Sequence, residues 1–333
     1  MTDVVSHSDF QAAATRALDH FSVQAETLRL VAISENVTFC VTDIGGDKYA
    51  LRLHRPGYNS LRELESERIW TSALGLKGLR VQTPERTTVG DFFCEVPVGD
   101  NGERRYAGLT RWLNGQVLGD YLRNESEQTS RLQIFKDIGA LAAKMHTQAI
   151  EWEMPSGFSR AYLDRDGLLG EDPRWGRFWE HSALDKDTQQ LLLRLRKRLQ
   201  RTLEVYGVTS QNFSLTHADL HPDNLLFGED VLGIIDFDDA AFGWHMYDLA
   251  AALFEYQGDA DFAQISDALI AGYRTQRALG TGDQSMVQVF LLIRGLALIG
   301  WFHQRPEHTD SNYFDDVLAL VIGNGNRYLS NTA

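Results

Sequence analysis

The sequence has little cysteine and no long hydrophobic run, and both absences limit what the chain can be. Its two cysteines, Cys40 and Cys94, fall within expected strands, which favours buried thiols over a disulfide and fits a reducing cytoplasm. The most apolar stretch, 287–301, is interrupted by Gln288 and Arg294, which predicts a buried helix and not a membrane span. The first residues show no basic segment followed by an apolar core, so we expect no signal peptide. We therefore expect a cytoplasmic protein without membrane contact.

The sequence also has fewer positively than negatively charged residues. Its 32 Lys and Arg residues against 46 Asp and Glu residues give a net charge of −14. Such an excess repels nucleic acid and anionic membranes, so we expect neither as a partner. The same charge is compatible with a cationic small molecule. The 333 residues suffice for one large domain or two lobes, as a monomer or a homodimer.

The most informative stretch is 215–240, which reads LTHADLHPDNLLFGEDVLGIIDFDDA. Two short apolar runs flank a Gly-Glu-Asp turn, which predicts a β-hairpin. Because a hairpin brings its open ends together, we expect Asn224 and Asp236 to lie side by side. Their oxygen atoms are ligands of the kind that Mg²⁺ prefers. Asp219 would face the metal from the preceding loop and accept a proton from a hydroxyl, which is typical of a phosphoryl-transfer site.

Two other interpretations of this stretch stay open. In the first, the polar residues form an ordinary loop, and Asp236 only caps the segment that follows. In the second, His217, Asp219, His221 and Asp236 bind a hydrolytic metal, although their spacing matches no closed ligand set.

The motifs HADLHPDN and IIDFDDA resemble those of the aminoglycoside phosphotransferase and choline kinase-like family, nearest to its homoserine kinase and stress-response kinase branch. The resemblance implies an α+β, bilobal protein kinase-like fold with an antiparallel N-terminal sheet, one helix beside it, and a mostly helical second lobe. It also implies that ATP and Mg²⁺ are bound, with Asp219 as the catalytic base and Asn224 and Asp236 as metal ligands. His217 would brace the loop by hydrogen bonds.

We expect the two lobes to meet near residue 111. Residues 1–111 would form the nucleotide-binding lobe, and 112–333 the catalytic and substrate-binding lobe. The stretch LTRWLNG resembles the family's hinge, where adenine meets backbone amides, and this places Arg111 and Leu113 beside the nucleotide. The strands expected in the first lobe are 27–33, 37–44, 48–54, 85–89, 92–98 and 105–112.

Strand 48–54 alternates so that Ala50 and Arg52 share one face. The pair resembles the kinase strand in which Ala covers the adenine and Lys binds the phosphates. Arg replaces Lys here, which keeps the charge but changes its geometry. An ordinary surface arginine is the alternative.

A helix expected over 60–74 carries Glu67, which the resemblance makes the partner of Arg52. Glu63, one turn earlier, is also possible, and either residue could simply interact with the helix dipole. The loop Ser34-Glu35-Asn36 would place backbone N–H groups over the phosphates, which assigns Ser34 and Asn36 to the nucleotide. This loop has no glycine, and a plain hairpin turn explains it equally well.

The predicted reaction transfers the γ-phosphoryl group of ATP to a hydroxyl of a small molecule. An amine-bearing acceptor such as homoserine, an amino alcohol or an aminoglycoside suits both the negative charge and the family. A protein Ser/Thr kinase of the stress-response type is the first alternative. Asp238 stands where protein kinases have glycine, however, and too few residues follow for a long activation segment. A non-catalytic nucleotide-binding regulator is the second alternative, and the sequence does not distinguish ATP from GTP.

Overall fold

The computed structural model describes residues 6–34, 36–100, 102–125, 127–228, 231–308 and 312–331. The chain forms two compact units, and the first collects segments that lie far apart in the sequence. Unit 1 comprises Met1–Gln116, Met154–Arg160 and Leu226–Asp238, and unit 2 comprises Val117–Glu153, Ala161–Leu225 and Asp239–Ala333. The architecture is α+β, as the sequence predicts.

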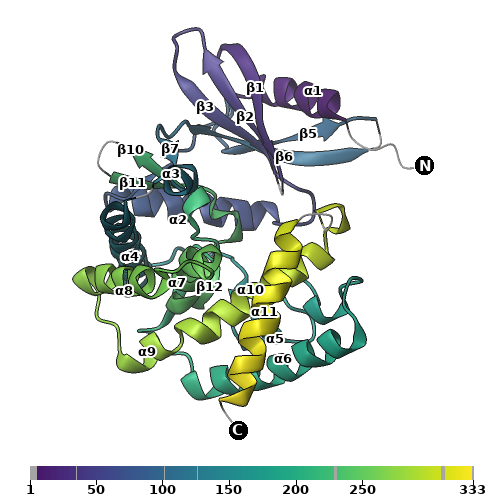
Figure 1. Ribbon diagram of the computed structural model, residues 1–333. Helices are drawn as coiled ribbons and strands as arrows, with labels where there is room; N and C mark the ends of the chain where they lie inside the picture. The colour runs from purple at the N-terminus through teal and green to yellow at the C-terminus, as the bar shows by residue number, and fades with distance from the viewer. Residues whose placement is uncertain are drawn as a thin grey trace. The chain divides into compact units, whose positions relative to one another are not determined.

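A five-stranded antiparallel sheet in the order β1-β2-β3-β6-β5 dominates unit 1 (Figure 1). Its strands are β1 (Ala25–Ile33), β2 (Val37–Asp43), β3 (Lys48–Leu53), β5 (Phe93–Val98) and β6 (Glu103–Arg111). Alternate side chains of the central strands, such as Phe39 and Leu51, form an apolar core with helix α1 (His7–Leu18). Because the side chains of a strand alternate between its faces, the residues between them point to the opposite face.

The described residues form no strand over 85–89, so that expectation is wrong. Only isolated bridges occur there, at Pro84 and Thr87. The Thr87 N–H donates to the Asp91 carbonyl oxygen at 2.7 Å and closes a turn. Gly90 makes this turn possible because its φ of 99° is one that other residues rarely adopt.

Helix α2 (Leu61–Leu76) begins with a capping box, in which Ser60 and Glu63 bind each other's backbone N–H groups. Its inner side buries Leu64, Trp70 and Leu74. A second sheet has the order β4-β11-β10-β7. Its strands are β4 (Arg80–Val81), β7 (Gln116–Val117), β10 (Leu225–Gly228) and β11 (Val231–Ile234). The strands β10 and β11 lie where the sequence predicts the hairpin, and its turn residues Glu229 and Asp230 lie outside the described residues.

Unit 2 is mainly helical and contains one small sheet, in the order β8-β12-β9. The strands are β8 (Tyr162–Leu163), β9 (Phe213–Thr216) and β12 (Ala241–Trp244). The α-helices are α3 (Leu118–Asn124), α4 (Gln128–Glu151), α5 (Arg165–Leu169), α6 (Lys186–Tyr206), α7 (His245–Leu253), α8 (Phe262–Gln276), α9 (Thr281–Ser285), α10 (Val287–His303) and α11 (Asn312–Ser330).

Helices α4 and α8 pack closely because each has a glycine at the contact. A Cβ added to Gly139 would lie 2.0 Å from the Leu269 carbonyl oxygen, and one added to Gly272 would lie 1.8 Å from that of Lys136. Backbone therefore meets backbone there, at a spacing that no side chain would allow.

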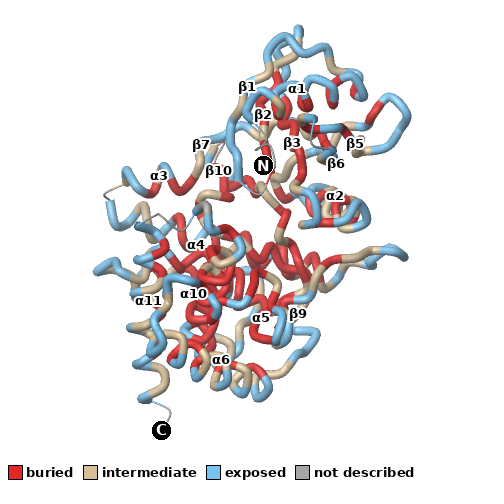
Figure 2. The backbone as a smooth tube through the Cα atoms, turned by 90° about the vertical axis from the view of Figure 1, so that its right-hand side faces the viewer, coloured by how far each residue is buried: buried red, intermediate tan, exposed pale blue. Residues whose placement is uncertain are grey.

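Helix α10 is buried on nearly all sides, as its apolar sequence predicts, and Figure 2 shows buried backbone at its place in the fold. Within the described parts of the chain, no helix has the length and hydropathy to cross a membrane. Arg294 lies in the middle of this helix and is itself buried. A buried guanidinium requires a partner, which makes Arg294 relevant to the site.

Candidate active site

A first group of candidate residues lies in unit 1, on the face of the large sheet opposite α1. The strand register pairs Thr38 with Arg52, and Arg52 with Gly108. The neighbouring row consists of Cys40, Ala50 and Thr110. Paired residues of adjacent strands project on the same side of a sheet. The side chains around Ala50 are therefore small, which leaves room for a flat ring on this face.

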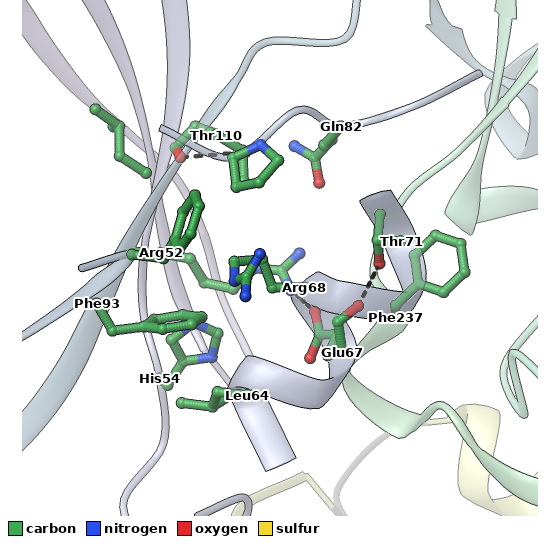
Figure 3. A pocket seen from close by; sticks show the side chains of 15 residues that line it. Arg52, His54, Leu64, Glu67, Arg68, Thr71, Gln82, Phe93, Thr110 and Phe237 are labelled. Atoms are coloured by element: carbon green, nitrogen blue, oxygen red, sulfur yellow. Dashed lines mark hydrogen bonds and ion pairs between the residues drawn. The ribbon is translucent and has the colours of Figure 1, made fainter. Parts of the chain in front are cut away.

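This face and helix α2 enclose a cavity of about 70 Å³ (Figure 3). Its wall includes the apolar residues Leu64, Phe93 and Phe237. Gly108 keeps the space open, because an added Cβ would lie 2.8 Å from the Phe93 ring. Arg52 also lines the cavity and places a positive charge on this face of the sheet.

Arg52 lies among carboxylates. Its Nη1 atom is 3.2 Å from Asp236 Oδ1 and 3.9 Å from Glu67 Oε1. Burial disfavours the guanidinium charge, but Asp236, Asp238 and Glu67 outweigh burial and raise the pKa of Arg52. Glu63 has another role, since its carboxylate accepts from the Ser60 N–H at 2.8 Å at the start of α2. The structure thus places Glu67 and not Glu63 beside Arg52.

Burial also affects Glu67. Together with the nearby charge of Asp238, burial raises the pKa of Glu67 to about 7, although Arg160 and Arg52 oppose this rise. Arg160 Nη1 lies 3.8 Å from Glu67 Oε2, so a second guanidinium flanks this carboxylate. Arg160 belongs to the short segment Met154–Arg160 of unit 1, and nothing in the sequence marked it.

The loop expected over the phosphates begins at Ser34. Its N–H donates to the Asn36 carbonyl oxygen at 3.0 Å and so closes the turn, while Glu35 lies outside the described residues. The Asn36 side chain is buried. Its Oδ1 accepts from the Arg55 N–H at 3.0 Å, and its Nδ2 donates to Asp238 Oδ2 at 2.9 Å. A nucleotide contact by Asn36 would therefore use its backbone and not its side chain.

Arg111 ends strand β6. The register pairs it with Tyr49, so its side chain projects on the face opposite Ala50. There it forms an ion pair with Asp47 at 3.1 Å, and its guanidinium lies over the Tyr49 ring at 4.8 Å. Its N–H donates to the Thr83 carbonyl oxygen at 2.7 Å. Leu113, two residues further on, is half-buried.

A second group of candidate residues lies in unit 2, in the loop after β9. Ala218 has a φ of 65°, which is strained for a residue with a Cβ. The carboxylate of Asp248 in α7 holds this conformation, because it accepts from the His217 N–H at 2.9 Å and from the Ala218 N–H at 2.7 Å. His146 Nε2 lies 3.0 Å from the same carboxylate.

Asp248, His146 and His217 are all fully buried. Burial raises the pKa of Asp248 to about 6, with His217 and the two N–H groups opposing the rise. Burial also lowers the pKa of His146 to about 3. A neutral histidine therefore meets the carboxylate at neutral pH, and the group supports the loop without forming part of its open surface. The sequence had pointed to a structural role for His217.

Asp219 follows directly and is held on three sides. Arg294 Nη2 contacts its Oδ1 atom, His221 Nε2 lies 3.3 Å from its Oδ2 atom, and Asn224 Nδ2 donates to Oδ2 at 2.9 Å. Burial would raise the pKa of this carboxyl, but Arg294 and His221 keep it well below its usual range. Asp219 is therefore an ionised hydrogen-bond acceptor throughout the neutral pH range. The sequence signal for Arg294 was a single charge within an apolar helix.

The predicted metal ligands suit a hard cation. The Nδ2 atom of Asn224 donates to both the backbone oxygen and the side chain of Asp219, at 2.9 Å each. This fixes the amide so that Oδ1 is the atom left for a cation. Asp236 supplies a carboxylate, and its φ of 64° shows a constrained backbone. Carboxylate and amide oxygens are ligands that Mg²⁺ accepts, so each of the two residues offers an atom that fits this metal.

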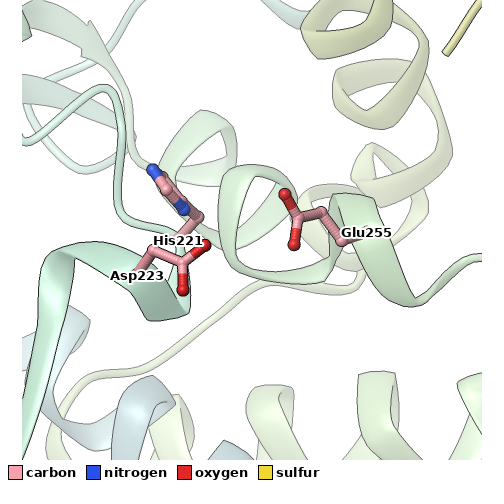
Figure 4. Close-up of side chains that lie close together, drawn as sticks. All are labelled: His221, Asp223 and Glu255. Atoms are coloured by element: carbon pink, nitrogen blue, oxygen red, sulfur yellow. The ribbon is translucent and has the colours of Figure 1, made fainter. Parts of the chain in front are cut away.

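Unit 2 also contains a cluster of three polar side chains, two of which follow Asp219 closely in the sequence. His221, Asp223 and Glu255 converge, with potential ligand atoms within 4.8 Å of one another (Figure 4). Glu255 also lines a polar cavity of about 340 Å³. Asp223 is 3.0 Å from Arg123, whereas Glu255 accepts from the Tyr313 hydroxyl at 3.4 Å.

Unit 1 has an antiparallel sheet with an arginine paired to a glutamate. Unit 2 is mainly helical and holds an ionised aspartate on a hydrogen-bonded loop. These features are typical of a phosphotransferase of the kinase-like class. The model of the family described as "Phosphotransferase enzyme family" matches residues 27–283 of this chain. The chain belongs to this family and is an enzyme of the phosphotransferase type.

Three relatives show the range of this similarity. A microcompartment-associated aminopropanol kinase is 31% identical, superposes with a TM-score of 0.82, and the match covers 97% of this chain and 98% of that one. Amicoumacin kinase hAmiN, solved with AMP-PNP, Ca²⁺ and Ami, is 19% identical with a TM-score of 0.77, over 98% and 97% of the two chains. The homoserine kinase of Nitrobacter winogradskyi is 28% identical over 204 residues, which are 56% of this chain and 59% of that protein.

Proposed function

We propose that this protein is an ATP- and Mg²⁺-dependent kinase that phosphorylates a hydroxyl group of a small, amine-bearing molecule. The observation that carries the proposal is the state of Asp219. Arg294 and His221 keep its carboxylate ionised, and Asn224 fixes its orientation. A carboxylate held in this way can accept a hydrogen bond from a hydroxyl and orient it for attack on a phosphoryl group.

The nucleotide would bind to the lobe formed mainly by residues 1–111. Ala50 would cover the base, while Arg52, paired with Glu67, would contact the phosphates. Backbone groups at Ser34 and Asn36 would approach the phosphates, and those at Arg111 and Leu113 the adenine. The small side chains beside Ala50 and the ion pair between Arg52 and Glu67 support these assignments.

The remaining residues, 112–333, would carry the catalytic loop and the acceptor. Asn224 and Asp236 would hold Mg²⁺, which neutralises charge on the phosphates when it is bound. Asp219 would orient the acceptor hydroxyl and take its proton late in the transfer, because its low pKa makes it a weak base. Arg294 would preserve the charge of Asp219, and Asp248 would hold the loop backbone.

Two observations support an amine on the acceptor. The polar cluster in unit 2 contains the carboxylates of Asp223 and Glu255. Among the described residues, Asp223 is paired with Arg123, whereas Glu255 has the Tyr313 hydroxyl as its partner. Glu255 would therefore attract an ammonium group. The aminopropanol kinase, similar over nearly its full length, is named for an amino alcohol. We rank amino alcohols first, ahead of homoserine and aminoglycosides.

The decisive experiment measures ADP release from ATP and Mg²⁺ with a panel of hydroxyl compounds. Each amino alcohol is paired with the matching alcohol that lacks the amine. Asp219→Asn serves as the inactive control, and Asp166→Asn, on the exposed surface of α5, as the matched control for an aspartate lost elsewhere. We expect one amino compound to stimulate ADP release in the wild type and in Asp166→Asn, but not in Asp219→Asn. ADP release that no compound stimulates, or that survives in Asp219→Asn, would contradict the proposal.

A further inference from the structure

Asp238 is a buried carboxylate in unit 1, two residues after the proposed metal ligand Asp236. Only 6% of its surface is exposed. Its Oδ2 atom accepts from Asn36 Nδ2 at 2.9 Å, and its Oδ1 atom lies 3.6 Å from His54 Nδ1. The side chain of Asp238 thus connects to the loop between β1 and β2 and to the end of the strand that carries Arg52.

The backbone of the same segment is held independently of this side chain. Asn59 Nδ2 donates to the Asp238 carbonyl oxygen at 3.0 Å, and Arg160 Nη2 donates to it at 2.6 Å. The Phe237 ring meets the buried Trp70 ring edge-on, with the centroids 5.6 Å apart. The position of residues 236–238 is therefore set by several contacts, of which the one from Asn36 reaches the loop that precedes β2.

The Asn36 amide has one donor and one acceptor in use, and they point to different elements. Its Oδ1 accepts from the Arg55 N–H, while its Nδ2 donates to Asp238. Asn36 is also buried, with 6% of its surface exposed. A shift of the loop would break a hydrogen bond to a buried carboxylate, and a shift of the 236–238 segment would break the same bond. Neither segment can move freely without the other.

We propose that the hydrogen bond between Asn36 and Asp238 couples metal binding at Asp236 to nucleotide binding under the loop at 34–38. Asn36 and Asp238 are positioning residues in this arrangement. The inference rests on the proposed function, which assigns the loop to the phosphates and Asp236 to Mg²⁺. Mg²⁺ that fixes Asp236 also fixes Asp238, and through Asn36 it holds the loop in the position that contacts the phosphates. Part of the gain in nucleotide affinity that Mg²⁺ brings therefore passes through this bond, which makes the effect a coupling between two sites.

The test measures the dissociation constant of ADP by calorimetry, with excess Mg²⁺ and with EDTA. The ratio of the two constants is the Mg²⁺-dependent gain. Hydrogen bonds to charged groups are among the stronger ones in proteins. We expect Asn36→Ala to reduce the gain about tenfold, and this loss should exceed any change in the ADP affinity measured in EDTA. Asp238→Asn keeps the shape of the side chain but removes its charge, and we expect a smaller loss of about threefold.

Asn59→Ala is the matched control. Asn59 is also a buried asparagine that donates to Asp238, but it binds the backbone carbonyl oxygen and lies outside the loop at 34–38. The gain should stay within about twofold of the wild type in this variant. In the double variant Asn36→Ala with Asp238→Asn, the loss should not exceed that of Asn36→Ala alone, since both changes remove one interaction.

The outcomes separate this inference from the proposed function. If the wild type binds ADP more tightly with Mg²⁺ and Asn36→Ala retains the full gain, the coupling is absent and only this inference fails. If Asn36→Ala weakens ADP binding equally with and without Mg²⁺, Asn36 has a structural role and the inference also fails. If the wild type binds no ADP under either condition, the proposed function itself is wrong. Should Asn36→Ala not fold, Asp238→Asn provides the same comparison.

Discussion

Replacing Arg294 with glutamine should change the pH range in which this enzyme works. Arg294 is buried and contacts the carboxylate of Asp219, the proposed base. Burial by itself would raise the pKa of Asp219, and the charges of Arg294 and His221 together keep it well below its usual range. Of the two, Arg294 lowers the pKa more, so its removal leaves mainly His221 to oppose the effect of burial on the pKa of Asp219.

The size of the effect follows from the contact. Two unit charges about 4 Å apart attract each other by about 4 kcal/mol at an effective dielectric constant of about 20. One pKa unit corresponds to about 1.4 kcal/mol. The whole attraction therefore corresponds to about three pKa units, and losing it brings the pKa of Asp219 up toward the ordinary value of about 3.9. Because the base must be ionised, activity in Arg294→Gln should fall as the pH decreases through the raised pKa.

The assay is kcat/KM for the acceptor, measured by ADP release between about pH 4 and 8. The wild type should show no acid limb from Asp219 in this range, whereas Arg294→Gln should lose activity toward its lower end. Arg294→Lys keeps a positive charge and should show a smaller change. Arg104→Gln removes an exposed ion pair with Glu95 and should leave the profile unchanged. Identical profiles for the wild type and Arg294→Gln would refute the reasoning.

Two further predictions concern stability. Asp248→Ala leaves the buried N–H groups of His217 and Ala218 without their acceptor, so we expect the free energy of unfolding to fall by about 2–5 kcal/mol in urea titrations. Unchanged stability would show that the loop has another support. Gly139→Ala forces a Cβ against the Leu269 carbonyl oxygen. It should lower the free energy of unfolding by about 1–3 kcal/mol or more. Gly323→Ala in α11, where an added Cβ meets nothing within 4 Å, should instead raise it by about 0.5–1 kcal/mol. Equal effects of the two glycine changes would contradict the packing argument.

Several features were predictable because they depend on residues close together in the sequence. The hairpin of β10 and β11 followed from two short apolar runs around a turn. Ala50 and Arg52 share a face because a strand has a period of two. Asp219 and Asn224 are five residues apart, and a short loop suffices to bring them into contact. The strand expected at 85–89 failed because a turn at Gly90 outweighed the propensity of the residues before it.

The sequence alone therefore determined the class of fold, the family and the candidates for base, basic residue and metal ligands, since periodicity and short spacing are local properties. The tertiary structure decided which distant residues control them. Arg294 meets Asp219 from 75 residues away, and Asn36 meets Asp238 from 202 residues away. It also decided that Glu67 and not Glu63 stands beside Arg52, because Glu63 is used to cap its own helix. Such pairings arise from the need of buried charges and amides for partners, and packing decides which partners lie within reach.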